Sequence, residues 1–453
     1  MKTPSYWSCL AFLGLLVGQT AGQEAAPAPA PSDPQPTLEQ RLEEQARALE
    51  ALREEVERLR ADPAHRPTAE EVDWTERVRV GLFWIESADG DHRMSLHARV
   101  HMDARFDLAS DFFDHTFQVR RARLEAQGRL FRRAEFKLGL EFGRTQGANL
   151  RDAWVKLVLL PEAQLWGGQM LLPFSTERLT SSNVMKHPER PIVIGDLLES
   201  RDVGFMLRSE LWGGAVVAAA GVYNGNGQNE RIDDDDDKDL AGRLEVTPLP
   251  GLLLSLNYVL SPVNRDAPAP SDVHTVGDQA SLFLDYDPGV RRLGRRQRMG
   301  GGARLRRGPV QLAAEWIGSL EEELVSPQGA RDDLFTWSAF VDASFVLTGE
   351  DEADSIRPLR PAWSEDQGIG PGAFELSLRY EHYQVEAEVL RHGFAVGSER
   401  ADSGTVTLTW IPVEGVRAML SYTGTAFARP VLDEGGAARW SDHVLVLRLA
   451  LFF

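Results

Sequence analysis

Apolar and polar side chains alternate without a break from Met94 to Leu108, and this alternation leaves the chain few possible folds. A β-strand points successive side chains to opposite faces, so the segment predicts a strand with one wholly apolar face and one wholly polar face. It is longer than the usual strand of a soluble protein, which has about 5–6 residues. About 9–11 tilted residues suffice to cross a bilayer. The segment therefore predicts a membrane-spanning strand.

The same period of two returns along the rest of the chain. It is clear at 134–143, 252–258, 374–381 and 405–410, and again in the apolar row that ends at Phe453. Such repeats, separated by turn residues, are the signature of a transmembrane β-barrel. A soluble sandwich also alternates, but its strands are usually shorter and its apolar faces must meet each other. We therefore predict an all-β fold, a transmembrane antiparallel β-barrel whose last strand closes on its first.

The composition excludes several classes of protein. Charged residues make up 26% of the chain, and the longest uncharged apolar stretch after the first twenty residues, 211–223, has only 13 residues. A membrane-spanning helix needs about 20. The formal net charge of −19 argues against a general nucleic-acid binder. The single cysteine, Cys9, excludes a disulfide scaffold and a cysteine-based zinc site.

The N-terminal part of the chain predicts an export signal and a spacer rather than barrel. Residues 1–22 have the layout of a secretory signal peptide, because a short basic start precedes an apolar core that is too short to span a membrane. Residues 23–36 are an Ala/Pro-rich linker. In 37–60, apolar residues recur at alternating spacings of four and three, which predicts a periplasmic coiled coil or, alternatively, one amphipathic helix on another surface. Residues 61–93 are a linker that leads into the barrel, which we assign to 94–453.

Counting back from Phe453 assigns a direction to each strand. With that residue on the periplasmic side, the periplasmic links should be short and the outer loops long. The short links are 160–163, 247–251 and 411–415. The long polar segments expected outside are 224–239, 261–278 and 427–442. Tryptophans that fit the two interfacial aromatic girdles are Trp154, Trp166, Trp212, Trp410 and Trp440.

Basic residues fall on the polar faces of several predicted strands. Arg99, Arg105 and Lys137 point into the lumen by simple alternation. Arg121 and Arg123 do so only if a bulge near Arg120 switches the register, because the apolar residues just before it obey the opposite one. Further predicted inward cations are Lys156, Arg243, Arg304, Arg379, Arg417 and Arg448.

These inward cations suggest a path for anions. In a narrow lumen with low-dielectric walls, arginine and lysine replace part of the water shell of an anion. Arginine suits phosphate because its planar fork donates two hydrogen bonds at once. The alternative is that these side chains only pair with neighbouring carboxylates, as inward charges do in any water-filled barrel.

Several segments, in a shared order, carry a resemblance to a known family. They include HTFQVRRARLEAQG (115–128), LRDAWV (150–155), GGQMLLPFSTERLTSS (167–182) and GAFELSLRYEHY (372–383). With the C-terminal strand pair, they resemble the phosphate-selective porin O and P family over about 94–453. The resemblance implies a barrel of 16 strands that assembles as a trimer, with a narrow constriction and a basic lining. Residues 71–453 give about 24 residues for each strand with its connection, which is compatible with that number.

The resemblance also implies roles for particular residues. The paired arginines of the family's constriction match Arg120 and Arg121, and an inward arginine of the first strand matches Arg99. The basic position of an inward-folded third loop matches Arg178. A constriction lysine of the family falls on Glu135, which puts a carboxylate where a cation is expected and brings phosphate specificity into doubt. Lys137 lies on the same face and is the available substitute.

Two further features have a simpler reading. The run Asp233–Asp237 suggests either a divalent-cation site or a solvated outer loop, and we favour the loop because EF-hand spacing is absent. His97 and His101 share a strand face, but four residues along a strand is about 13 Å, which is too far for one metal. No catalytic motif, metal site or cofactor site is predicted, so we do not expect an enzyme.

The sequence thus predicts a passive outer-membrane porin of a Gram-negative bacterium, with small anions, phosphate or polyphosphate above others, as its solutes. Expected partners are a homotrimer, outer-membrane lipid, the permeating anions and the barrel-insertion machinery, which by the resemblance reads the C-terminal strand ending in Phe453; nucleic acid is not expected. One alternative is a general or weakly cation-preferring porin, because residues 71–453 carry −15. The other is a structural tether that works through the coiled coil, with the barrel as its anchor.

Overall fold

The computed structural model describes most of the chain from residue 83 onward. The described residues are 83–87, 90–108, 115–143, 147–160, 162–192, 194, 197–198, 201–230, 236–262, 267–268, 270–275, 281–364, 368–433 and 435–453. The predicted signal peptide, Ala/Pro-rich linker and coiled coil lie outside these residues, as does most of the run Asp233–Asp237.

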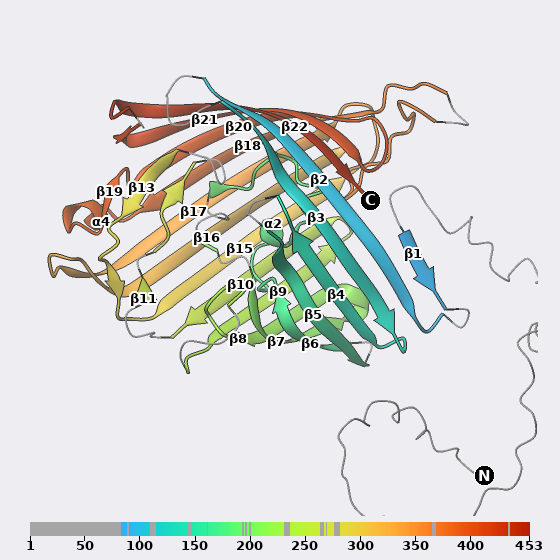
Figure 1. The fold of residues 1–453 in the computed structure, drawn as a ribbon, viewed down its shortest axis with the longest axis horizontal. Coiled ribbons are helices and arrows are strands. Elements are labelled where there is room, and N and C mark those ends of the chain that lie inside the picture. Colours follow the sequence, from blue (N-terminus) through green and yellow to red (C-terminus); the bar gives the residue numbers. More distant parts are fainter. Residues whose placement is uncertain are drawn as a thin grey trace, which may run out of the picture. The chain divides into compact units, whose positions relative to one another are not determined.

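Sixteen long antiparallel strands close into a barrel (Figure 1). Closure joins the first of them to the last, with Arg99 opposite Phe452 and Asp107 opposite Val444. This confirms the predicted all-β barrel and its strand number. In chain order the strands are β2 (Arg93–Asp107), β3 (Thr116–Leu130), β4 (Ala134–Glu141), β5 (Asn149–Leu160), β6 (Ala163–Met170), β7 (Asp202–Leu211), β8 (Val216–Tyr223), β9 (Asp239–Leu249), β10 (Leu252–Ser261), β15 (Arg296–Arg307), β16 (Val310–Val325), β17 (Arg331–Val346), β18 (Ala373–Val385), β20 (Arg400–Ile411), β21 (Val416–Leu432) and β22 (Ala438–Phe452).

The remaining elements are short. The strand β1 (Phe83–Glu86) pairs with the start of β2, beyond the point where β22 ends. Among the described residues, no helix is both long and apolar enough to cross a membrane. The other short elements are β11 (Ala267–Pro268), β12 (Val273–His274), β13 (Leu282–Tyr286), β14 (Arg291–Arg292), β19 (Ala395–Gly397), α2 (Thr176–Leu179), η2 (Trp212–Gly214) and α4 (Glu388–Arg391).

The two ends of the barrel differ in their connections. We call the end that carries Phe453 the turn end, because six of the seven links β3–β4, β5–β6, β7–β8, β9–β10, β15–β16, β17–β18 and β20–β21 there are short. The exception is 347–372, which is long. The opposite end, which we call the loop end, carries long connections at 171–201 and 262–295. The predicted outer loop 427–442 is wrong in extent, because β21 continues to Leu432 and β22 begins at Ala438.

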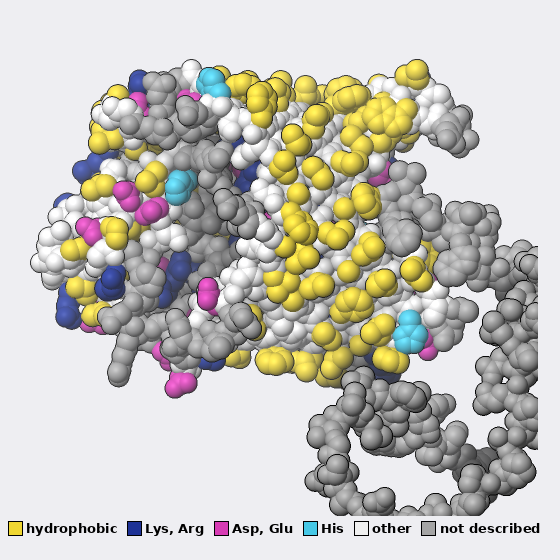
Figure 2. Space-filling view, in the orientation of Figure 1, with side chains coloured by type: hydrophobic (Ala, Val, Ile, Leu, Met, Phe, Trp, Pro, Cys, Tyr) yellow, Lys and Arg dark blue, Asp and Glu magenta, His cyan; other side chains and the backbone are white. Residues whose placement is uncertain are grey.

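The outer surface of the barrel is apolar and the inner surface is polar. On β20, Val406 and Leu408 are exposed on the outside, whereas Thr405 is buried on the inside and shares a 2.9 Å hydrogen bond with Thr423. Figure 2 shows apolar side chains spread in a broad band over the strands, with charged side chains gathered toward the loop end. A soluble monomer rarely exposes so large an apolar surface. The surface therefore faces lipid, and the alternation in the sequence reflects lipid outside and water inside.

Two of the five tryptophans assigned to the interfacial girdles fit that position. Trp212 is exposed at the turn end, and Trp410 lies on the outer face of β20. Trp440 is exposed near the loop end, but it shares the strand parity of the inward Asp442. Trp154 and Trp166 are wrong, because they share the inner faces of β5 and β6 with polar residues. The inward position of Trp154 could be predicted from the sequence, since Asp152 and Lys156, two residues before and after it, lie on the same strand face.

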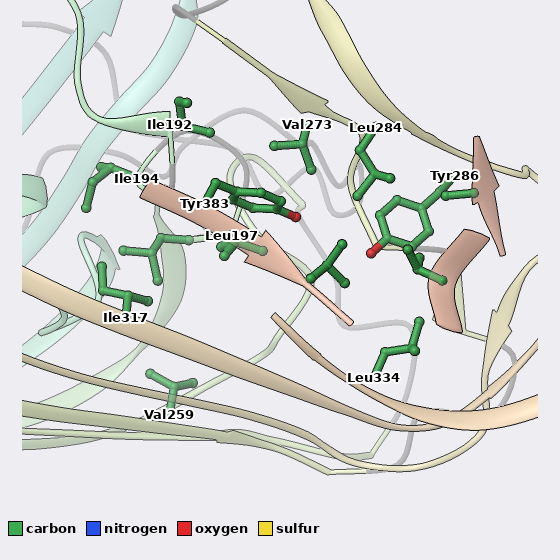
Figure 3. Close-up of a cluster of buried hydrophobic side chains, with 14 of the residues drawn as sticks. Ile192, Ile194, Leu197, Val259, Val273, Leu284, Tyr286, Ile317, Leu334 and Tyr383 are labelled. Carbon is green, nitrogen blue, oxygen red and sulfur yellow. The ribbon is translucent and has the colours of Figure 1, made fainter. Parts of the chain in front are cut away.

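A hydrophobic cluster fills part of the lumen at the loop end (Figure 3). There β12, β13 and β19 form a small sheet of their own. Phe283 of that sheet packs edge-on against Tyr383 of β18 at 5.3 Å and stacks near Phe427 of β21 at 5.8 Å. Loop segments are thus held against the inner faces of neighbouring barrel strands, which leaves the opposite side of the lumen for a polar path.

A charge on the outer face should reveal which surface faces lipid. Leu447, 44% exposed, lies near the middle of β22, and Leu432, 67% exposed, lies at the loop end of β21. We expect Leu447→Arg to lower the free energy of unfolding from vesicles by about 2–4 kcal/mol. Leu432→Arg should lower it by about 1 kcal/mol or less, because the cost of a charge on the lipid face falls toward the membrane surface. Urea titration of vesicle-inserted protein measures both. Equal losses would contradict the placement of lipid.

Candidate functional site

The connection between β6 and β7, residues 171–201, folds into the lumen, and we call it the inner loop. Its short helix α2 is capped by Ser175, whose hydroxyl accepts a hydrogen bond from the Arg178 amide at 3.0 Å and donates one to Glu315 of β16 at 2.6 Å. Further along, the Ile192 amide donates to Glu381 of β18 at 2.7 Å. The loop therefore reaches strands far from its own, as the family resemblance implied for a third loop.

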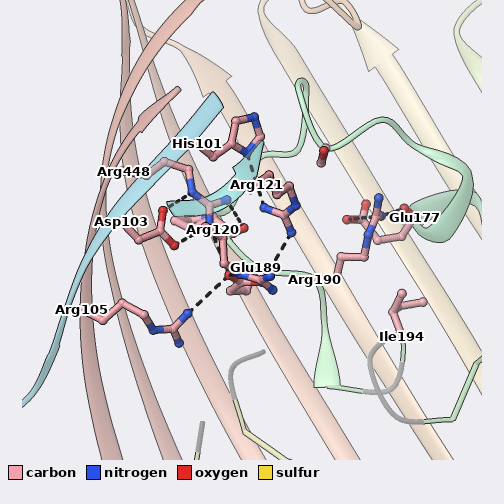
Figure 4. A network of polar contacts seen from close by, with 12 residues as sticks. His101, Asp103, Arg105, Arg120, Arg121, Glu177, Glu189, Arg190, Ile194 and Arg448 are labelled. Atoms are coloured by element: carbon pink, nitrogen blue, oxygen red, sulfur yellow. Dashed lines mark hydrogen bonds and ion pairs between the residues drawn. The ribbon is translucent and has the colours of Figure 1, made fainter. Parts of the chain in front are cut away.

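One carboxylate of the inner loop, Glu189, collects guanidinium groups from three strands (Figure 4). The guanidinium of Arg120 of β3 donates two hydrogen bonds to it, of 2.6 and 2.8 Å. Arg105 of β2 and Arg448 of β22 reach it at 3.4 and 3.2 Å, and Arg121 lies at 3.7 Å. These contacts hold the inner loop against the wall where the barrel closes.

Charge–charge attraction keeps this carboxylate ionised. Burial alone would raise the pKa of Glu189, but the guanidinium groups of Arg120 and Arg121 outweigh burial and hold the pKa well below its usual range. A group whose pKa is lowered on folding loses its stabilising contribution only when the pH falls through that lowered value. The contact between loop and wall should therefore survive acid that protonates an exposed glutamate.

A β-bulge places two consecutive arginines on the lumen side of β3. His101 pairs with Arg121, and the next residue, Met102, pairs with Val119, so Arg120 is the extra residue. Both arginines are buried inside the barrel, at 4% and 5% exposure. The switch of register expected near Arg120 is confirmed, and it explains how neighbours in sequence can face the same way.

Beside the inner loop lies a cavity of about 700 Å³. Its wall on β2, β3 and β4 is basic, and its loop side presents the hydroxyls of Thr180, Ser181 and Ser182. Two carboxylates, Glu125 and Glu189, also line it. Its ten lysine and arginine side chains are Arg99, Arg120, Arg121, Arg123, Lys137, Arg151, Arg178, Arg190, Arg201 and Arg296.

Described carboxylates pair with several of these cations. Glu125 binds Arg99 at 2.8 Å and Lys137 at 3.3 Å, and Asp152 binds Arg201 at 2.9 Å. Among the described residues, four further carboxylates pair with the cations of the lining without lining the cavity themselves. The four behind the lining are Glu141, Asp152, Glu177 and Glu321.

The structure brings six of the thirteen predicted lumen cations together at the cavity. The predicted inward cations that are not part of its described lining include Lys156, Arg243, Arg304, Arg379, Arg417 and Arg448. Arg105 differs, because it is fully buried behind the cavity and reaches only its edge through Glu189. The six that line the cavity are Arg99, Arg120, Arg121, Arg123, Lys137 and Arg178.

Four lining arginines were missed in the sequence. Arg190 and Arg201 belong to the inner loop, which has no periodicity to read, and Arg296 begins a strand. Arg151 sits at a register shift, where Asp152 pairs with Gly139 but Leu150 pairs with Leu140. A second bulge thus reverses its face, and only the adjacent polar pair Arg151 and Asp152 hints at this in the sequence.

The carboxylate that departs from the family pattern is not part of the cavity lining. Glu135 pairs across the strands with Lys156 at 2.5 Å, nearer the turn end. Lys137 on the same face does line the cavity, in contact with Glu125. The substitute considered from the sequence is therefore in place.

The inner loop is also fixed toward the turn end. Lys186 forms ion pairs with Glu375 of β18 at 2.6 Å and with Glu352 of the long segment 347–372. Ile356 of that segment packs with Val346, Ala373 and Ile411. Near the turn end, loop and segment thus occupy the lumen beside β18 and β21.

Removing one acidic group from the cavity should raise its preference for anions. We expect Glu125→Gln to raise the chloride-to-potassium permeability ratio by about fivefold, since two charges about 4 Å apart in water interact by about 1 kcal/mol. The matched change Glu135→Gln, on the next strand, should leave the ratio unchanged because Glu135 lies outside the lining. Reversal potentials in a salt gradient measure both. An equal response of the two variants would contradict the assignment of the lining.

The comparisons with known proteins agree with this architecture. A family model described as phosphate-selective porin O and P matches residues 94–453. The fold is similar to an anion-selective porin from Comamonas acidovorans, with a TM-score of 0.52 and 14% identity, over 80% of this chain and 100% of that chain. A search of curated proteins found no match.

Two further solved structures share the fold. OmpF of Salmonella typhi, in complex with daunomycin, has a TM-score of 0.51 and 12% identity, over 82% of this chain and 100% of that chain. The outer membrane channel DcaP of Acinetobacter baumannii has a TM-score of 0.50 and 11% identity, over 82% of this chain and 99% of that chain. At such identities the likeness concerns the barrel alone.

Proposed function

This chain belongs to the phosphate-selective porin O and P family of outer-membrane porins, and on that premise we propose that it lets small anions, phosphate and polyphosphate in particular, diffuse passively across the outer membrane. One observation carries the proposal. Residues 71–453 carry −15, yet the described lining of the cavity has ten basic side chains and two carboxylates, Glu125 and Glu189. Positive charge is thus concentrated where the lumen is narrowed by the inner loop.

The cations are arranged as successive steps. The lumen face of β3 carries, in order toward the turn end, Arg121, Arg123 and the carboxylate Glu125. The next cation is Lys137 of β4, which lies opposite Gln127. An anion leaving one guanidinium meets another a few ångströms further, so it never has to regain its whole water shell. Arginine can hold two phosphate oxygens at once.

The acidic groups of the lining favour weak, reversible binding of anions over tight binding. Conduction needs binding that is favourable enough for entry but weak enough for release. Glu125 contacts Arg99 and Lys137 directly and so competes with a bound anion for both. The mechanism is diffusion past exchangeable ion pairs, with no bond made or broken.

We also propose an oligomeric state, a membrane and an orientation for the channel. The barrel works as a homotrimer in the outer membrane of a Gram-negative bacterium, with the turn end and the coiled coil at 37–60 in the periplasm. Its C-terminal strand, ending in Phe453, is the segment that the insertion machinery reads.

Competition between anions tests the proposed solute. In planar bilayers bathed in potassium chloride, we expect added phosphate to reduce the chloride current, because a multiply charged anion stays longer beside the arginines. Pyrophosphate should act at lower concentration than phosphate. A current unaffected by millimolar amounts of either would contradict phosphate as a solute of this channel, whereas a potassium-preferring channel would contradict anion transport itself.

A further inference from the structure

Two tryptophans lie side by side on the lumen wall of β5 and β6. The ring centroids of Trp154 and Trp166 are 4.4 Å apart, with the ring planes at 46°. Both side chains are half-buried, so each keeps part of its surface open. Both side chains lie on the inner face of the barrel. Trp154 is two residues from the inward Asp152, and Trp166 is two residues from the inward Gln164, so each shares a strand face with its polar neighbour.

The pair directly adjoins the basic cavity, on its turn-end side. Trp154 is the cross-strand partner of Lys137, which lines the cavity. Lys156 lies over the ring of Trp166, with its ammonium 5.2 Å from the ring centre. An anion that leaves the cavity toward the turn end therefore passes aromatic surface flanked by cations on both sides.

One position of the wall next to the pair carries no side chain. Gly168 is the cross-strand partner of Trp154. On the following strand, the ring of Tyr223 lies against Gly204, the partner of Gly168. A Cβ at Gly168 would lie 2.2 Å from the carbonyl oxygen of Ala153, so the backbone leaves no room for a side chain there. Bare backbone beside an indole makes a flat surface, which suits a flat ligand.

We propose that Trp154 and Trp166 form an aromatic shelf that contacts the ring of ring-bearing organic phosphates as they leave the basic cavity. This deepens the proposed function and rests on it. The cavity of about 700 Å³ is also far larger than one inorganic phosphate needs, and lies within the range of about 300–1,000 Å³ that sites for drug-sized ligands occupy. Stacking against an aromatic pair should tighten the hold on a ring about two- to tenfold.

The test compares two phosphate esters of equal charge, one with a ring and one without. Phenyl phosphate and methyl phosphate are each added to chloride-conducting channels in planar bilayers, and the concentration that halves the current is recorded. We expect phenyl phosphate to act at about two- to tenfold lower concentration. Trp154→Leu and Trp166→Leu should each reduce this difference, while Trp316→Leu on the outer face of β16 should leave it intact.

Each result decides the matter. Equal potency of the two esters on the wild-type channel would overturn the shelf, and this comparison needs no variant to fold. A phenyl preference that persists in both lumen variants would overturn it too, because the ring would then bind elsewhere. A potassium-preferring reversal potential would refute the proposed function itself, whereas equal block with anion preference intact refutes the shelf alone.

Discussion

Replacing both Arg121 and Arg178 with glutamate should abolish the anion preference of the channel. Both side chains line the cavity, one on β3 and the other on α2 of the inner loop. Each Arg→Glu change lowers the local charge by two, so the pair lowers the charge of the lining by four. At the short distances inside a lumen, this is the largest electrostatic change that two substitutions can make.

Reversal potentials in a potassium chloride gradient measure this effect. The neutral pair Arg121→Gln with Arg178→Gln should give an intermediate preference. As a matched control, Arg331→Glu with Arg391→Glu alters the total charge equally at exposed positions near the loop end and should keep the wild-type potential. If the lumen variant keeps that potential as well, these two arginines do not determine selectivity.

Neutralising the carboxylate that holds the inner loop should release the loop from the wall. Glu189→Gln leaves Arg120 buried without its two-pronged partner and takes the shared charge away from Arg105 and Arg448. Breaking a buried ion pair in this way costs about 3–5 kcal/mol. We expect faster hydrogen–deuterium exchange in peptides from 171–201 and a noisier, larger single-channel current.

A second acidic residue of the same loop provides the control. Glu177 makes only longer ion pairs, at 3.5 Å to Arg190 and 3.9 Å to Arg379, so Glu177→Gln should have a smaller effect. Phosphate should partly restore the quiet current of the Glu189 variant, because a free anion can occupy the place of the lost carboxylate among the guanidinium groups. Unchanged exchange and current in Glu189→Gln would show that other contacts hold the loop.

The barrel was predictable because its physics is local. The alternation in Met94–Leu108 depends only on which medium lies on each side of one strand, and β2 shows the expected faces. The register switch at Arg120 was readable for the same reason, since apolar residues change parity on passing it. The strand number came from the family resemblance rather than from periodicity.

The inner loop shows where local reasoning ends. Glu189 accepts a hydrogen bond from Arg448, which is 259 residues away in the sequence, and no sequence pattern predicts that contact. Arg190 and Arg201 of this loop were missed for the same reason, because a loop held by distant side chains has no period, and Arg178 was found only through the family resemblance. The tryptophans on β5 and β6 were misplaced through reliance on residue type, although the parity of their polar neighbours puts them inside.

The sign of the wild-type reversal potential tests the central claim most directly. With purified protein in a planar bilayer and a tenfold potassium chloride gradient, the account predicts a zero-current potential close to the equilibrium potential of chloride. A zero-current potential displaced toward that of potassium would contradict it, because the basic cavity would then not govern what passes.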